Sequence, residues 1–330
     1  MEMKEAKQSS LLNALLAAGL TVALFYFTTT VMPFLHVLLL FPFVTLYVSE
    51  GPKWTGLSMV LTLVAGGILV GWEETLVQAI YFIPASLCMG EMIRRKSEPR
   101  DEVLLTSLVI FAAVLGQLFL ADKIAGTSWF ESVRQGIQEG VEGQLANLGS
   151  QVEEADLPAL QYQVSVAMDI LVHSIPGILY VSSLITALVT GLLSHFISLS
   201  SHLDVRPFAL ADFELSRFWT LVLLGALALG SIFSGNPYYG NAVVVALSLL
   251  LLNGMGYIDF RFQWRMIHWM GRLILYFFFI FLVLPGFLAL FLGIGDGLLG
   301  LRMKFRERPK PWTKLQRIKT TRRSRWLSPS

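Results

Sequence analysis

Long apolar runs, separated by short polar or charged stretches, extend along this chain from residue 11 to about residue 301. A bilayer core about 30 Å thick is crossed by roughly 20 helical residues, and several runs have about that length. Eight membrane segments are predicted before a final, longer run: Leu11–Val31, Phe34–Ser49, Thr55–Gly71, Glu73–Met92, Val103–Ala121, one within Val164–Leu199, Phe218–Phe233 and Ala242–Ile258. Membrane β-strands alternate apolar and polar residues, so continuous runs favour an all-α, polytopic transmembrane helical bundle with eight or more membrane segments.

The polar stretch between the fifth and sixth runs, residues 122–160, differs from the other connections. It is acidic, and its apolar residues recur at intervals of three and four, beginning with Trp129, Phe130, Val133 and Ile137. That spacing predicts an amphipathic helix. We expect an external helical insert that lies along the outer membrane surface or caps the bundle.

The last apolar run, Leu273–Leu301, is too long for one straight span and too short for two ordinary ones. It contains Pro285-Gly286 and one acid, Asp296. In one interpretation Pro285-Gly286 is the apex of a tight or re-entrant hairpin, which returns the tail to the cytoplasm. In the other, the run is a single tilted span and the tail is external.

Composition and charge agree with a membrane protein. Hydrophobic residues make up 55% and charged residues 15% of the chain, whereas soluble domains carry about 25% charged residues. The net charge is +2, but the chain from Arg302 onward holds eleven Lys and Arg against one acid, Glu307. Such a tail favours anionic lipids at the cytoplasmic face, and no nucleic-acid partner is expected.

The basic loops give an orientation and a domain plan. With the N-terminus inside, the loop at residues 94–100 is cytoplasmic and the acidic insert is external, in agreement with the positive-inside rule. The plan has four parts: a cytoplasmic N-terminus (1–10), a six-segment membrane bundle that includes the insert 122–160 (11–200), additional membrane segments (201–301) and a basic tail (302–330). The setting expected for such a multi-pass protein is the bacterial cytoplasmic membrane.

Nothing in the sequence argues for catalysis. The five histidines are scattered without metal-ligand spacing, and Cys88 is the single cysteine. The motif Gly295-x-Gly297-x-x-Gly300 matches a dinucleotide fingerprint by spacing but follows no strand. We therefore expect no enzyme activity, no cofactor and no metal site.

Polar residues within or beside the apolar runs are the candidate ligand-binding residues, because ionisable groups in lipid are costly. Asp169 and His173 share a helix face at i and i+4, either as a ligand site or as an interfacial pair in contact with water. Asn253 either binds a ligand or hydrogen-bonds to a neighbouring helix. Asp296 either has a transport role or pairs with Arg272, Arg302 or Arg306 and fixes the final turn.

Small residues four apart allow helices to approach closely. Two such pairs stand out, Ala14 with Ala18 and Gly67 with Gly71. We expect these residues to serve helix packing or partner docking.

Several local motifs are shared with one family. They include Ser49-Glu-Gly-Pro-Lys-Trp-Thr-Gly56, Leu252-Asn-Gly-Met-Gly-Tyr-Ile-Asp-Phe260, and Leu292-Gly-Ile-Gly-Asp296 followed by Phe305-Arg306. With the order of apolar segments and the acidic insert, they make residues 11–306 resemble the YybS-like family of predicted bacterial integral membrane proteins. That resemblance implies a membrane protein of unknown function.

The first six segments are also similar to the S components of energy-coupling-factor transporters, whose first helix carries the Ala-x-x-x-Ala motif matched by Ala14 and Ala18. This similarity implies a transporter-like subunit that binds a small molecule among segments four to six and docks a membrane coupling subunit. The alternative is a non-enzymatic scaffold or assembly protein of the cell envelope.

Overall fold

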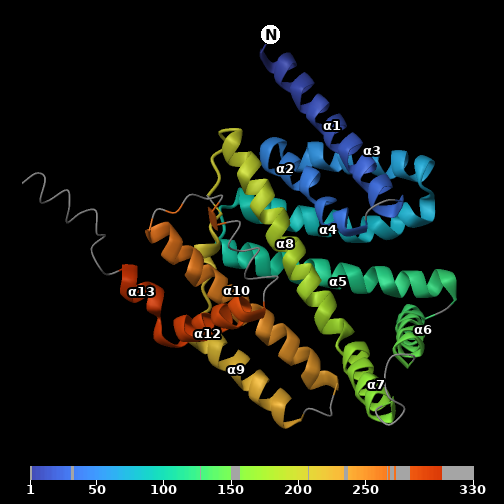
Figure 1. Ribbon diagram of the computed structural model, residues 1–330. Coiled ribbons are helices and arrows are strands. Elements are labelled where there is room, and N and C mark those ends of the chain that lie inside the picture. Colours follow the sequence, from blue (N-terminus) through green and yellow to red (C-terminus); the bar gives the residue numbers. More distant parts are fainter. Residues whose placement is uncertain are drawn as a thin grey trace, which may run out of the picture. The chain divides into compact units, whose positions relative to one another are not determined.

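The computed structural model describes residues 2–30, 33–126, 128–149, 157–206, 208–233, 237–265, 267, 271–272 and 283–306. Over these ranges the regular elements are helices, without strands (Figure 1). The all-α prediction is therefore confirmed.

Six of the described helices are long and apolar enough to cross a membrane. They are α1 (Glu2–Thr30), α3 (Pro52–Leu69), α4 (Trp72–Arg94), α5 (Pro99–Ala125), α8 (Ile175–Ser200) and α10 (Pro237–Trp264). Three predicted segments correspond to shorter apolar helices: α2 (Phe41–Glu50), α9 (Arg217–Ile232) and α12 (Val283–Leu299). The prediction of eight or more membrane segments is thus not confirmed.

The second predicted segment is divided for a local reason. Residues 34–49 form the end of a 3₁₀ helix, η1 (Pro33–Leu38), and then most of the ten-residue α2. Pro42 lies in the first turn of α2, where a missing N–H costs no intrahelical hydrogen bond. A run that looks like one span in composition is therefore two short elements.

The chain divides into two compact units. Unit 1 comprises Met1–Phe208 and Gly230–Val245, and unit 2 comprises Ala209–Leu229 and Ala246–Ser330.

In unit 1, α5 packs between α4 and α8, and α1 packs against α3 (Figure 1). The short α2 contacts α1, α3, α4 and α8, and its Phe43 stacks on Phe82 of α4 with ring centroids 5.2 Å apart. With contacts to four other helices, α2 is a central packing element despite its length.

The predicted insert, residues 122–160, contains α6 (Trp129–Gly149) and the first residues of α7 (Leu157–His173), which continues into predicted segment six. The predicted amphipathic helix is therefore present as α6; its external position stays a prediction. Segment six is interrupted at Ser174, where α7 ends and α8 begins with Pro176 in its first turn.

The small residues singled out in the sequence have three different environments. Ala14 and Ala18 are buried inside unit 1, so they serve packing within the chain and are covered against an external partner. Gly67 packs against the Trp72 ring, whose Cε3 atom lies 2.5 Å from the position that a Cβ atom at Gly67 would take. Gly71 has φ of +126° in the connection between α3 and α4, which is a turn position and not a helix-packing one.

Unit 2 contains most of α9 and of α10, all of α12 and the short α13 (Leu301–Arg306), together with the 3₁₀ turn η2 (Leu210–Asp212). Gly300, with φ of +59°, ends α12 and redirects the chain into α13. Pro285-Gly286 lies within the first turn of α12, so the prediction of a hairpin apex at these residues is wrong. Proline is accepted there because the first N–H groups of a helix have no intrahelical partner. Residues 273–282 and the tail 307–330 lie outside the described residues.

Candidate functional site

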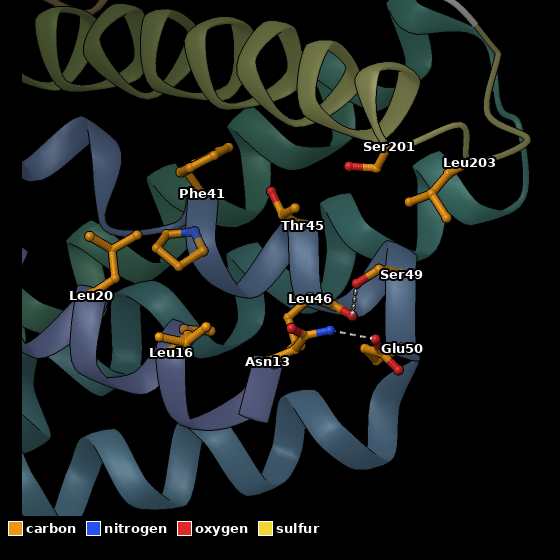
Figure 2. A pocket seen from close by; sticks show the side chains of 12 residues that line it. Asn13, Leu16, Leu20, Phe41, Thr45, Leu46, Ser49, Glu50, Ser201 and Leu203 are labelled. Atoms are coloured by element: carbon orange, nitrogen blue, oxygen red, sulfur yellow. Dashed lines mark hydrogen bonds between the residues drawn. The ribbon is translucent and has the colours of Figure 1, made fainter. Parts of the chain in front are cut away.

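A pocket of about 440 Å³ opens in unit 1 between α1, α2 and the chain just after α8 (Figure 2). This volume lies within the range of small-molecule sites, roughly 300–1,000 Å³. Its lining is divided between apolar residues and a polar group: Leu16, Ala17, Leu20, Phe41, Pro42, Leu46 and Leu203, then Asn13, Thr45, Ser49, Glu50 and Ser201.

The polar residues gather toward one end of the pocket. Figure 2 shows Leu20 and Phe41 toward one end, and Asn13, Ser49 and Glu50 toward the other. Such an arrangement suits an amphiphilic molecule with an apolar body and a polar end.

Glu50 is held at this end by the backbone around it. It is the last residue of α2, and Gly51, with φ of +88°, makes the sharp connection to α3 that begins at Pro52. Its carboxylate accepts hydrogen bonds from Ser10 Oγ at 2.5 Å and from Asn13 Nδ2 at 2.8 Å. Both donors are neutral, and no Lys or Arg of the described residues forms an ion pair with Glu50. Within the described part of the chain, the Glu50 carboxylate is therefore held by neutral donors.

Thr45 adds an unused polar atom to the same pocket. Its Oγ1 is buried and has no hydrogen-bond partner in the described part of the chain. Buried polar atoms nearly always have a partner, so this unsatisfied hydroxyl marks Thr45 as a candidate polar contact beside the pocket.

The predicted pair on segment six gives no assembled site in the described structure. His173, the last residue of α7, is exposed, and its carbonyl oxygen accepts a 2.7 Å hydrogen bond from Asn241 Nδ2. The side chain of Asp169 lies outside the described residues. The ligand-binding role of these two residues stays a prediction.

The other two candidates, Asn253 and Asp296, come together in unit 2 around Arg302. Arg302 is fully buried. Its Nε donates to Asp296 at 2.7 Å, and its NH2 group donates to the carbonyl and side-chain oxygens of Asn253 at 2.8 and 2.9 Å. The pairing predicted for Asp296 is confirmed with Arg302, whereas Arg272 pairs with Asp259 instead.

This cluster is saturated. The NH1 group of Arg302 donates to the carbonyl oxygens of Ala211 and Phe213 at 2.8 and 2.7 Å, which fixes the chain around η2. A guanidinium has five N–H donors, and all five are used. Asn253 in turn donates to Gly293 O and accepts from Leu215 N. The arrangement holds four segments together and leaves the guanidinium no donor for a ligand.

A different pair, not singled out from the sequence, lies between α5 and α8. Glu102 Oε2 and His195 Nε2 share a 2.8 Å hydrogen bond, and both side chains are at most 2% exposed. The residues are 93 positions apart, so no local motif marks them. The predicted orientation did contain one clue. It places the start of the fifth segment, next to Glu102, and the end of the sixth, which holds His195, on the same side of the membrane.

The helices and the buried polar groups define a multi-pass α-helical membrane protein. The family described as "Predicted membrane protein (DUF2232)" matches residues 19–297, and the chain belongs to this family. No curated protein and no solved structure matches the chain.

Proposed function

We propose that this protein is a transporter-like, solute-binding protein of the bacterial cytoplasmic membrane, and that the pocket between α1 and α2 receives the solute. The observation that carries the proposal is the pocket itself: about 440 Å³, apolar along most of its lining, with Glu50 and Asn13 joined by a hydrogen bond at one end. With the N-terminus inside, this polar end lies toward the cytoplasm. The expected solute is a small amphiphile with an N–H or O–H donor at its polar end.

The proposal moves the site away from segments four to six, where the resemblance to S components had suggested it. It keeps a separate membrane coupling subunit as the proposed partner. It also moves partner docking off Ala14 and Ala18, because these residues are covered within unit 1. The exposed side of α1 carries leucines instead, including Leu12 at 57% and Leu16 at 62% exposure.

Two substitutions on α1 test the pocket. Leu16 lines it, whereas Leu12, one turn earlier and equally exposed, does not. We expect Leu16→Trp to fill the pocket and remove a small molecule that co-purifies with the wild-type protein, because an indole occupies space that the solute needs. Leu12→Trp is the matched control and should retain it. Native mass spectrometry of the detergent-solubilised proteins measures the bound mass and its occupancy.

A Thr45→Val variant probes the polar chemistry, because it removes only the unpartnered hydroxyl. Occupancy should fall about fivefold to tenfold if that hydroxyl contacts the solute. Equal occupancy in Leu16→Trp and Leu12→Trp would refute the pocket, and a wild-type protein that carries no small molecule would favour the scaffold alternative.

A further inference from the structure

The Glu102–His195 pair leaves polar atoms unused inside a helix bundle. Glu102 Oε1 and His195 Nδ1 are buried and have no hydrogen-bond partner among the described residues. Both residues lie within candidate membrane spans, Pro99–Leu120 and Ile175–Ser200. Ionisable groups at such positions are expensive and usually functional.

Two serines on the same side of α8 add to this set. Ser194 and Ser198 are buried, and neither Oγ has a partner in the described part of the chain. Elsewhere on α8 the hydroxyls are used locally, since Ser183 donates to Leu179 O and Thr186 to Ser182 O. Near His195, the hydroxyls of Ser194 and Ser198 therefore form no hydrogen bond with the backbone of α8.

The atoms of this set that lack a partner can all act as hydrogen-bond acceptors. When His195 donates its Nε2 hydrogen to Glu102, its Nδ1 presents a lone pair. A carboxyl oxygen such as Glu102 Oε1 can also accept a hydrogen bond, and so can each serine oxygen. The described residues place no Lys or Arg in an ion pair with Glu102. With His195 neutral and Glu102 ionised, a cation that carries N–H or O–H donors would match both the carboxylate charge and the unpartnered acceptors.

We propose that Glu102, His195, Ser194 and Ser198 form a buried site for a small N–H-donating cation, either an ammonium ion or the primary-amine end of an organic molecule. The site lies on different residues from the pocket. Ser201 lines the pocket and is the C-cap residue of α8. It follows Ser198 by three residues, which places both residues on the same side of the helix. The polar side of α8 therefore extends from Ser201 at the pocket to Ser198 at the buried pair.

Thermal unfolding of the full-length protein in detergent tests this site. Ammonium chloride and methylammonium chloride are compared with sodium chloride and tetramethylammonium chloride at equal concentration. Ammonium is expected to raise Tm, because a ligand that binds only the folded state stabilises it. Tetramethylammonium has the charge but no N–H donor, so it should act like sodium. A response to methylammonium that equals or exceeds that to ammonium identifies the amine source.

Substitutions connect the effect to the four residues. Glu102→Gln should raise the ammonium concentration needed for half of the shift by about tenfold or more, and Ser198→Ala by a smaller factor. Ser198→Ala removes a hydroxyl without a partner, so it keeps the test valid if Glu102→Gln does not fold. Ser183→Ala is the control, because the Ser183 hydroxyl donates within α8 to Leu179 O, and it should respond as the wild type does.

Three results would overturn the proposal: no Tm shift with either amine, an equal shift with tetramethylammonium, or an undiminished shift in both Glu102→Gln and Ser198→Ala. None of these results depends on the solute pocket, because the Leu16→Trp experiment is read out by bound mass. Failure of one site therefore leaves the other open to its own test.

Discussion

Replacing Arg302 with methionine will destabilise unit 2 by about 3–5 kcal/mol, the range found when one partner of a buried ion pair is removed. The substitution keeps much of the side-chain volume but leaves the Asp296 carboxylate buried with its guanidinium partner gone. It also removes donors from the carbonyl oxygens of Ala211, Phe213 and Asn253. The expected measurement is a large fall in Tm of the purified protein, with earlier proteolysis of unit 2.

Arg306→Met is the matched control on the same short helix. Arg306 is half exposed and lies 3.7 and 3.9 Å from Asp212 and Glu214, so its loss should cost less than about 1 kcal/mol. The double variant Arg302→Met/Asp296→Leu should recover part of the lost stability, because it removes the unpaired charge. Equal Tm values for Arg302→Met and Arg306→Met would contradict the assignment of Arg302 as the central contact of unit 2.

The Arg302 cluster also shows how far sequence reasoning reaches. Asp296 and Arg302 are six residues apart at the end of one apolar run, so their pairing was among the sequence predictions. Asn253 was singled out separately, but its contact with Arg302 spans 49 residues. Hydrophobic periodicity indicates which face of a helix is apolar; it does not indicate which helix packs there. The same limit hid Glu102 and His195, each of which reads as an ordinary residue near a helix end.

The elements themselves were largely predictable where one run forms one helix. The predicted segment Val103–Ala121 corresponds to α5, and the predicted amphipathic helix corresponds to α6. The prediction of one continuous segment at residues 34–49 failed, because average hydrophobicity does not reveal a local break into a 3₁₀ helix and a short α-helix. The solute pocket forms beside this short α2, and its residues come from three separate parts of the chain, so no single stretch of sequence predicts it.

Replacing Gly254 with valine will disrupt the packing of α10 against α12, with an expected cost of about 3 kcal/mol or more, since the overlap involves backbone that cannot rotate away. A Cβ atom at Gly254 would overlap the carbonyl oxygen of Ala289, and one at Gly293 would overlap that of Leu250. Each helix thus places a glycine against the other's backbone. This close approach also brings Gly293 O within 2.7 Å of Asn253 Nδ2, so separating the helices weakens the Arg302 cluster as well.

Gly225→Ala on α9 is the control for this prediction. No atom lies within 4 Å of a Cβ atom at Gly225, so the substitution should leave stability unchanged or raise it by about 0.5–1 kcal/mol through helix propensity. Tm and the yield of folded protein in detergent are compared across the wild type, Gly254→Val, Gly293→Val and Gly225→Ala. Gly254→Val and Gly293→Val should both lower Tm and the yield of folded protein, because both force α10 and α12 apart. Wild-type stability in either one would show that α10 and α12 do not need glycine contact, and the close packing assigned to unit 2 would be wrong.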